Sequence, residues 1–170
     1  LAILEKAERA VVTSSGMSAI TTSLLTFLKS GDHLLAHNTL YGGTADYVKH
    51  DLPNYNISTD YINVLDPSSW KSKLKSNTKV IYVETITNPL LEVGALDEVA
   101  KFAKEHGLIS MIDNTLASPA LFCPIPLGFD ISVHSATKYL NGHTDIVAGA
   151  IIGNEPHMTE VNSKLIHLGG

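Results

Sequence analysis

The sequence predicts an α/β fold in which a mostly parallel sheet is covered by helices on both faces. Short apolar stretches alternate along the chain with longer segments of helical periodicity, and this alternation is typical of α/β proteins. Several of the apolar stretches are hydrophobic throughout, as expected for strands buried on both faces of a parallel sheet. With 170 residues, of which 44% are hydrophobic and 17% are charged, the chain is long enough for one domain with a sizeable core.

The first half of the chain is predicted to alternate between helices and strands. In chain order we expect a helix end at 1–9, a strand at 10–12, a helix at 17–29, a strand at 33–36, a helix at 44–52 and a strand at 59–64. Ile20, Leu24 and Phe27 recur at helical spacing, and Gly31 is expected to cap that helix. Pro53 is expected to end the next one.

The second half continues the same alternation. We expect a helix opened by Asp66 and Pro67, a strand at 80–84, a helix at 95–106, and strands at 108–112, 131–134 and 148–152. Asp97 and Glu98 suit the positive end of the helix at 95–106, and Gly107 is expected to terminate it. No further element is predicted after the last strand.

Composition excludes several classes of protein. The formal net charge of −5 and the absence of a basic stripe argue against nucleic-acid binding. Cys123 is the single cysteine, so no internal disulfide is possible, which fits a reducing compartment such as the cytoplasm. No apolar stretch is long enough to span a bilayer, and no signal peptide is visible. The chain begins without Met and ends on Gly169-Gly170, so we expect a piece of a longer protein.

Small or polar groups follow the ends of four predicted strands. They are Ser15-Gly16-Met17, the segment 84–88, Asp113-Asn114-Thr115, and the segment 135–138. Ligands of open α/β sheets bind beyond the carboxyl ends of the strands. We therefore expect these groups to converge on one crevice.

Lys138 is the most unusual of these residues. It lies in Ser135-Ala136-Thr137-Lys138-Tyr139, just past a predicted buried strand, and a buried lysine is costly unless its chemistry is used. A lysine among hydroxyls suits pyridoxal phosphate, which needs a Schiff-base lysine and a phosphate site. Taken alone, such a run is more often an ordinary surface turn.

The other strand-end groups each have two interpretations. Ser15-Gly16-Met17 joins a strand to a helix N-terminus and could bind a phosphate, although an N-cap serine followed by a turn glycine is the commoner case. Asp113 closes a strand and would need a cation such as a protonated pyridine nitrogen, or it forms an Asx turn. Tyr41, among glycines, could stack on a planar ring or fill a surface groove. Asn88 could donate to a phenolate-type oxygen or simply open a turn before Pro89.

Metal and nucleophile sites are not indicated. His33 and His37 are four residues apart, but they lie in a predicted strand and loop rather than on one helix face. His134 and His143 flank the lysine motif without the spacing of metal ligands. Cys123 is interpreted as a small packed residue, not as a nucleophile.

Together, these motifs resemble one family. Ser135-Ala136-Thr137-Lys138-Tyr139, continued by the segment 141–149, is similar to the signature of the Cys/Met-metabolism enzymes that depend on pyridoxal phosphate (PLP). The other motifs fall in that family's order over nearly the whole chain. The resemblance implies an aminotransferase type I fold. Residues 1–170 would form the PLP-binding large domain, in part, without the N-terminal arm and the C-terminal small domain.

The resemblance implies a role for each strand-end group. Lys138 would hold the cofactor as a Schiff base and act in catalysis, Asp113 would pair with the pyridine nitrogen, and Tyr41 would stack on the ring and protonate the leaving group. The remaining cofactor-binding positions are the backbone N–H groups of Gly16 and Met17, the hydroxyls of Ser135 and Thr137, and Asn88. Glu84 would lie near the substrate.

The implied activity is PLP-dependent cleavage of the C–S bond of sulfur amino acids by β- or γ-elimination, like that of cystathionine γ-lyase. A γ-replacement synthase, such as cystathionine γ-synthase or O-acetylhomoserine sulfhydrylase, is the alternative, and an inactive or partner-binding fragment is a third. Methionine γ-lyases typically carry cysteine where this chain has Gly43, which weakens that assignment, and Leu116 stands where phenylalanine is usual.

The resemblance also implies a homotetramer with shared active sites. A Tyr-x-Arg segment and a substrate-binding arginine of the family lie outside this sequence, so the chain alone is expected to be inactive.

Overall fold

A computed structural model describes all 170 residues and contains a single seven-stranded sheet. In chain order the strands are β1 (Arg9–Thr13), β2 (His33–His37), β3 (Ser58–Ile62), β4 (Thr78–Glu84), β5 (Ile109–Asp113), β6 (Ile131–Ser135) and β7 (Gly149–Gly153). Their order in the sheet is β1-β7-β6-β5-β4-β2-β3. Only β7 runs antiparallel to its neighbours, and all other pairs are parallel, which confirms the mostly parallel sheet.

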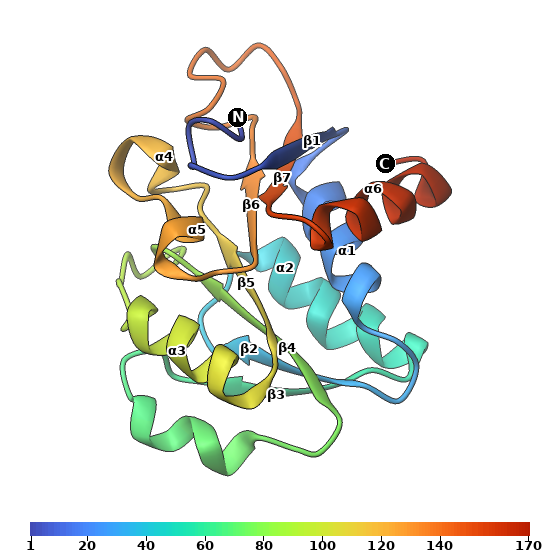
Figure 1. The fold of residues 1–170 in the computed structure, drawn as a ribbon, viewed down its shortest axis with the longest axis vertical. Helices are drawn as coiled ribbons and strands as arrows, with labels where there is room; N and C mark the ends of the chain where they lie inside the picture. Colours follow the sequence, from blue (N-terminus) through green and yellow to red (C-terminus); the bar gives the residue numbers. More distant parts are fainter.

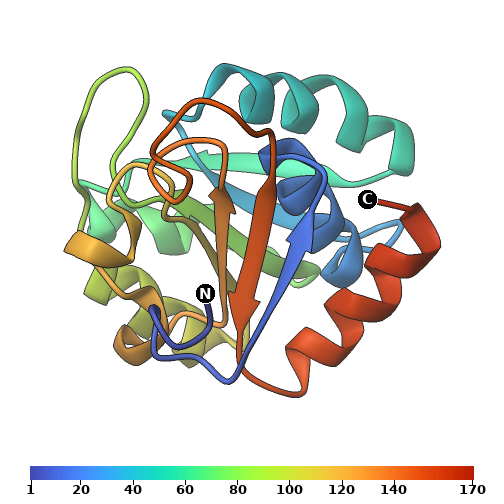
Figure 2. The same ribbon diagram turned by 90° about the horizontal axis from the view of Figure 1, so that it is seen from above.

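Helices cover both faces of this sheet (Figures 1 and 2). The α-helices are α1 (Gly16–Phe27), α2 (Gly42–Asp46), α3 (Leu96–His106), α4 (Ser118–Leu121), α5 (Pro124–Leu127) and α6 (His157–Leu168). A π-helix η1 (Tyr47–Asp51) and two 3₁₀ helices, η2 (Leu52–Tyr55) and η3 (Pro67–Lys73), complete the set. In Figure 1 the red α6 lies beside the blue α1, and the yellow-green α3 lies on the other side of the sheet.

Each face of the sheet has its own hydrophobic core. Leu24 of α1 and Val161 of α6 pack with Tyr82 and other side chains of the first face. Val99 of α3 and Trp70 of η3 pack with the side chains of the second face. All of these side chains are essentially inaccessible to solvent, and this double burial explains why the strands are apolar along their whole length.

The N-terminal helix end predicted at residues 1–9 is wrong, because residues 2–6 form turns. The sequence of residues 1–9 is helix-like, and in such a helix a charged residue would face solvent. Instead Glu5 is buried, and its carboxylate bonds to β6 and to the loop after β5. A tertiary contact therefore overrides the local pattern. Gly31 is not the C-cap of α1 either. That helix ends at Phe27, Leu28 caps it in extended conformation, and Gly31 adopts a φ of 91° in the turn that follows.

Pro53 does not end the helix before it. The chain passes from α2 through η1 into η2, where Pro53 occupies a first-turn position that needs no N–H donor. The helix predicted after Asp66 is the 3₁₀ helix η3, and the Asp66 side chain does not cap its backbone. Two of the helices that the sequence did not indicate, α4 and α5, are four residues long, and the third is α6. Only Met158 and Val161 are buried in α6, so its apolar pattern is weak.

The topology gathers strand ends at one edge of the sheet. Since β1, β2, β4, β5 and β6 run in the same direction, the residues that follow each of them meet there. Gly149, the first residue of the reversed strand β7, pairs with both Thr13 and Ser135 at this edge. The loop from β6 to β7 therefore returns to the place where the predicted site residues begin.

Candidate active site

A cavity of about 660 Å³ opens at this edge. It is lined by every site residue expected from the sequence: Gly16, Met17, Tyr41, Glu84, Asn88, Asp113, Ser135, Thr137 and Lys138. Apolar side chains that were not predicted from the sequence share the lining, among them Ile20, Ile86, Tyr139 and Val147. The predicted crevice is thus present as one continuous space.

The N-terminus of α1 forms one wall of the cavity. Ser15 is the N-cap, and its hydroxyl accepts the N–H of Ser18 at 3.1 Å. The N–H groups of Gly16 and Met17 lie in the first turn, where a helix provides no acceptor. A Cβ at Gly16 would lie 2.7 Å from Cβ and 2.9 Å from Cα of Ser135, so only glycine lets the helix end approach β6 this closely. The resulting cradle of backbone donors fits a phosphate.

The hydroxyl of Thr137 already has partners. It accepts the N–H of Ala148 at 3.0 Å and donates to the Ala148 carbonyl at 3.2 Å. Thr137 therefore holds the end of the β6–β7 loop against the site. To donate to a phosphate, it would have to give up the Ala148 carbonyl, whereas the neighbouring Ser135 hydroxyl has no such bond.

Asp113 supplies a carboxylate without a basic partner. Its Oδ1 accepts the N–H of Thr115 at 2.9 Å, and no Lys or Arg forms an ion pair with it. Part of its surface opens on the cavity, but enough protein surrounds the carboxyl that burial raises its pKa, while the Thr115 hydrogen bonds and His134 act in the opposite direction. A cationic ligand group is the partner that such a carboxylate lacks.

Glu84 joins two loops of the site. Its carboxyl is buried at the end of β4, where Oε1 accepts the N–H of Tyr41 at 2.6 Å and Oε2 accepts the N–H of Asn88 at 3.1 Å. Burial raises the pKa of Glu84 to about 7, with the two N–H donors opposing this rise and the charge of Asp113 adding to it. The sequence placed Glu84 near the substrate without a defined role, and its bonds give it the role of fixing the Tyr41 and Asn88 loops.

Tyr41 reaches the cavity because its neighbour is small. A Cβ at Gly43 would lie 2.8 Å from Cε1 of Tyr41 and 3.2 Å from Sδ of Met17. Any side chain at position 43 would thus displace the tyrosine ring from its present place. The ring remains about half exposed, at 49%, and so presents a free face.

Lys138 differs from expectation in its burial. It was expected to be a buried lysine, but it is exposed, in the turn that follows β6. The physical reason is that β6 ends at Ser135, so Lys138 lies beyond the buried part of the sheet. It belongs to a turn that is closed by a hydrogen bond from the Lys138 N–H to the Ser135 carbonyl at 3.1 Å. Its side chain is therefore accessible to a ligand.

The histidines and the cysteine have structural surroundings. No group of three or more His, Cys, Asp or Glu side chains is arranged to hold a metal ion. His33 is buried, and its Nδ1 lies 2.8 Å from the Thr78 hydroxyl. His37 is also buried, and burial lowers its pKa to about 4. The thiol of Cys123 lies 3.4 Å from the carbonyl oxygen of Leu4 and is packed at the base of the N-terminal segment.

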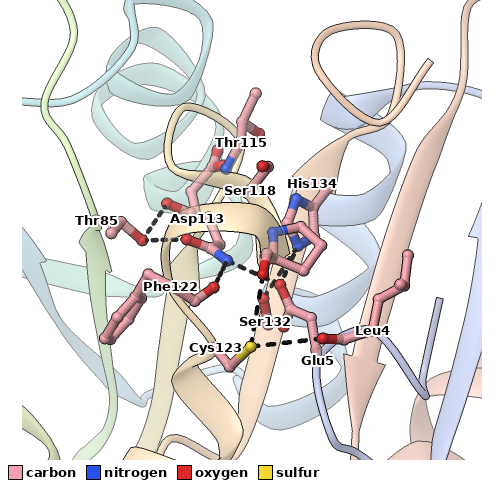
Figure 3. A network of polar contacts seen from close by, with 12 residues as sticks. Leu4, Glu5, Thr85, Asp113, Thr115, Ser118, Phe122, Cys123, Ser132 and His134 are labelled. Atoms are coloured by element: carbon pink, nitrogen blue, oxygen red, sulfur yellow. Dashed lines mark hydrogen bonds and ion pairs between the residues drawn. The ribbon is translucent and has the colours of Figure 1, made fainter. Parts of the chain in front are cut away.

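A buried polar network lies behind Asp113 and was not anticipated (Figure 3). Glu5 Oε1 is 2.6 Å from His134 Nε2 and accepts the amide of Asn114 at 2.8 Å. Glu5, Asn114 and His134 are all within 1% of complete burial. No sequence pattern links a residue at position 5 to positions 114 and 134, so only the fold reveals this network.

The fold is an α/β domain, and the lining of its cavity has the polar groups that a phosphate-bearing, ring-containing cofactor needs. Residues 1–170 match the model of the Cys/Met metabolism PLP-dependent enzyme family, and the chain belongs to this family. The cofactor is pyridoxal 5'-phosphate. Its parts find matching groups in the cavity, namely a helix end for the phosphate, an unpaired carboxylate for the pyridine nitrogen and an accessible lysine for the aldehyde.

Relatives are found in both sequence and structure. A probable cystathionine γ-synthase of Herpetosiphon aurantiacus is 41% identical over 160 residues, which cover 94% of this chain and 50% of that protein. An L-methionine γ-lyase of Porphyromonas gingivalis is 40% identical over 162 residues, covering 95% of this chain and 41% of that protein. The crystal structure of cystathionine γ-lyase from Lactobacillus plantarum complexed with L-serine has a TM-score of 0.96 at 34% identity, covering 99% of this chain and 44% of that one.

The chain spans about half the length, or less, of the curated relatives it matches. None of its helices is both long and apolar enough to cross a membrane.

Proposed function

We propose that the protein cleaves the C–S bond of sulfur amino acids by PLP-dependent β- or γ-elimination, in the manner of a cystathionine γ-lyase. One observation carries the proposal: a lysine side chain, an unpaired carboxylate and a helix N-terminus line the same cavity. When bound, the cofactor supplies an electron sink that stabilises negative charge developing at the substrate's α-carbon. All further chemistry belongs to side chains of the protein.

The cofactor would be held at three points. The N–H groups of Gly16 and Met17, with the hydroxyl of Ser135, would receive the phosphate. Asp113 would pair with the pyridine nitrogen and keep it protonated. Tyr41 would cover one face of the ring, and Asn88 would support the phenolic oxygen.

Lys138 and Tyr41 would move the protons. Once a substrate amine replaces it, the Lys138 amine is free to take a proton from the α-carbon and return it at another carbon. The phenol of Tyr41 would donate a proton to the departing sulfur. Glu84 would keep that phenol in reach, because it binds the backbone of Tyr41.

A γ-replacement synthase is the second candidate, and the names of the relatives support both. The probable cystathionine γ-synthase and the L-methionine γ-lyase are almost equally similar to this chain. Gly43 argues against a methionine γ-lyase, because the resemblance implies a cysteine at this position in those enzymes. The same active site would perform either reaction. Release of the product without addition of a thiol gives elimination, and addition of a thiol before release gives replacement.

Two measurements on the purified full-length protein test the proposal. Borohydride reduction after incubation with PLP should attach the cofactor covalently at Lys138, and a label elsewhere, or none, would overturn the proposal. Ammonia and keto acid should be released from cystathionine, homocysteine or methionine without added thiol. A strict requirement for a thiol would favour the synthase instead.

The assembly and location of the protein follow from the same proposal. We infer a homotetramer with shared active sites, acting on small sulfur amino acids in the cytoplasm. Sedimentation of the full-length protein would measure the assembly state, and a monomer with full activity would contradict the shared site.

A further inference from the structure

Tyr82 is a buried polar side chain without a part in the proposed mechanism. It lies on β4, two residues before Glu84, and packs in the core on the first face of the sheet, where it is 0% exposed. Its phenol oxygen is buried and has no hydrogen-bond partner of ordinary geometry. A buried hydroxyl is costly unless it is paired, so the groups around this oxygen indicate its role.

The register of the sheet places Tyr82 close to Asp113. Glu84 on β4 pairs with Asp113 on β5, and Tyr82 pairs with Met111. Since side chains alternate along a strand, these four project from the same face of the sheet. Asp113 is the diagonal neighbour of Tyr82 on that face, within reach of a long aromatic side chain. Tyr82 does not line the cavity, so it meets Asp113 from within the core.

Thr44 is the second group that reaches the phenol. It lies in α2, directly after the loop of Tyr41, and its hydroxyl is also completely buried without a partner of ordinary geometry. Thr44 and Asp113 are the side chains that interact with the Tyr82 hydroxyl by hydrogen bonding, through contacts that are long or bent. Because solvent does not reach either hydroxyl oxygen, water cannot supply the missing bonds. The two hydroxyls are left with each other and with Asp113.

The direction of donation follows from the charge of Asp113. A carboxylate that pairs with a pyridine nitrogen is ionised and only accepts, so the phenol donates to it and accepts from the Thr44 hydroxyl. Burial raises the pKa of Tyr82 well above its ordinary value, and the charges of Asp113 and Glu84 add to this rise. The phenol therefore keeps the proton that it donates.

We propose that Tyr82 is a positioning residue, whose phenol donates to the Asp113 carboxylate and is itself held by the Thr44 hydroxyl, so that Asp113 keeps a free oxygen turned to the pyridine nitrogen. The inference rests on the proposed pairing of Asp113 with the cofactor. Hydrogen bonds of an active site are often long or poorly aligned without the ligand and tighten when it binds. Since Thr44 follows the loop of Tyr41, this polar row (Thr44, Tyr82 and Asp113) also connects the proposed ring-stacking residue to the proposed nitrogen partner.

The substitution Tyr82→Phe in the full-length protein removes the phenol oxygen and keeps the ring. Tyr47→Phe is the matched control, because Tyr47 packs against the same core and its phenol oxygen is also buried without a partner. Tyr47 does not line the cavity, and the charges that act on it are those of Tyr55 and Asp51. Urea unfolding of the apo variants separates a loss of stability from a loss of cofactor affinity.

The first readout is the PLP dissociation constant, measured by equilibrium titration. Tyr82→Phe should weaken binding about tenfold at pH 7, as expected for the loss of a hydrogen bond to a charged group, and Tyr47→Phe should bind as the wild type does. Equal affinity of Tyr82→Phe and the wild type would overturn the inference and leave the proposed function intact. Failure of the wild type to bind PLP would overturn both.

Thr44→Val tests the order of the polar row. Valine keeps the shape of threonine but cannot donate, so PLP binding should weaken roughly threefold, less than in Tyr82→Phe. The double variant should bind no more weakly than Tyr82→Phe alone, because Thr44 acts through the phenol. Unchanged binding by Thr44→Val, or a double variant that loses the product of both effects, would contradict the polar row.

The third readout does not involve the cofactor, and a purely structural role of Tyr82 would not change it. Carbon-13 NMR follows the ionisation of the Asp113 carboxyl in the apo protein. Loss of a donor destabilises the ionised form, so the pKa of Asp113 should be higher in Tyr82→Phe than in the wild type, by about one unit, and unchanged in Tyr47→Phe.

The other titratable groups around the Asp113 carboxyl are the same in all three proteins. They are Glu84 on β4, His134 on β6, and Lys138 and Tyr41, which line the cavity. A difference between the variants therefore reports the phenol alone. An equal pKa of Asp113 in Tyr82→Phe and the wild type would overturn the inference whatever the binding data show.

Discussion

Gly16 and Ser135 approach more closely than any side chain at position 16 would permit. Gly16→Ala places a Cβ 2.7 Å from that of Ser135, and because Ser135 Cα is also only 2.9 Å away, rotating the serine side chain cannot relieve the clash. The start of α1 must move away from the end of β6, which widens the phosphate cradle. Overpacking of this kind costs about 1–3 kcal/mol, so we expect PLP affinity to fall roughly tenfold or more, measured by equilibrium titration.

Gly42→Ala is the control for that substitution. Gly42 also begins a helical segment near the site, as Gly16 does, but its added Cβ would meet no atom within 4 Å. It should bind PLP as the wild type does. Equal affinities for both alanine variants would show that the close approach of α1 and β6 is unimportant for the cofactor.

Glu84→Gln should change how stability depends on pH. The pKa of Glu84 is about 7 in the folded protein against an ordinary value of 4.5, so the folded state binds more protons between these values and loses stability as pH rises through them. Glutamine has no such titration. From pH 5 to pH 8 the wild type should therefore lose about 2–3 kcal/mol relative to Glu84→Gln.

Urea unfolding of the apo proteins at pH 5 and pH 8 measures this difference. His37, whose pKa is about 4, gives the opposite pH trend, but it is present in both proteins and cancels in the comparison. If wild type and variant differ in free energy of unfolding by the same amount at pH 5 and at pH 8, the pKa of Glu84 is not raised in the folded protein, and the prediction is wrong.

At the scale of single residues, the sequence predicts which groups line the cavity but not how they bond. Asp113 and Lys138 could be found because Asp113 ends an apolar strand and Lys138 follows one, and strand ends meet at one edge. The role of Glu84 could not be found, because its partners are backbone N–H groups, and the side-chain sequence does not indicate which backbone groups a carboxylate will bind. Glu5 could not be found either, because its contacts depend on the register of β5 and β6.

Among the elements, α3 is the one whose end is best explained by its sequence. Gly107 caps it with a φ of 64°, and its N–H bonds back to the carbonyls of Ala103 and Lys104. Gly107→Ala should lower the free energy of unfolding by about 1 kcal/mol, because alanine is strained in this conformation. PLP affinity should stay unchanged, since α3 does not line the cavity. A loss of affinity without a loss of stability would contradict this separation.

The elements that could not be predicted have a common cause. The N-terminal turns contain a helix-like pattern, but burial of Glu5 decides their conformation. Helix α6 buries only Met158 and Val161, too few for its periodicity to stand out. The strands and α1 were predictable because both faces of the sheet are covered, which forces continuous apolar runs.

At the scale of the whole molecule, the site consists of segments that are distant in sequence and that the sheet brings together. Binding of PLP should therefore stabilise the fold as a unit, by about 2.7 kcal/mol when its concentration is one hundred times the dissociation constant. The stabilisation should also be uneven. Backbone amides at the carboxyl edge should exchange more slowly with solvent when PLP is bound, at residues 15–17, 84–88, 113–115 and 135–138.

Hydrogen–deuterium exchange with and without PLP measures this pattern. The opposite edge provides the internal control, since Gly31, Asn56 and Asn77 lie there in turns bonded to one another and away from the cavity. Their exchange should change no more than global stabilisation requires. Selective protection at that edge, or protection confined to one of the four segments, would contradict a site assembled from the ends of β1, β4, β5 and β6, because a ligand that spans the cavity must order all of them together.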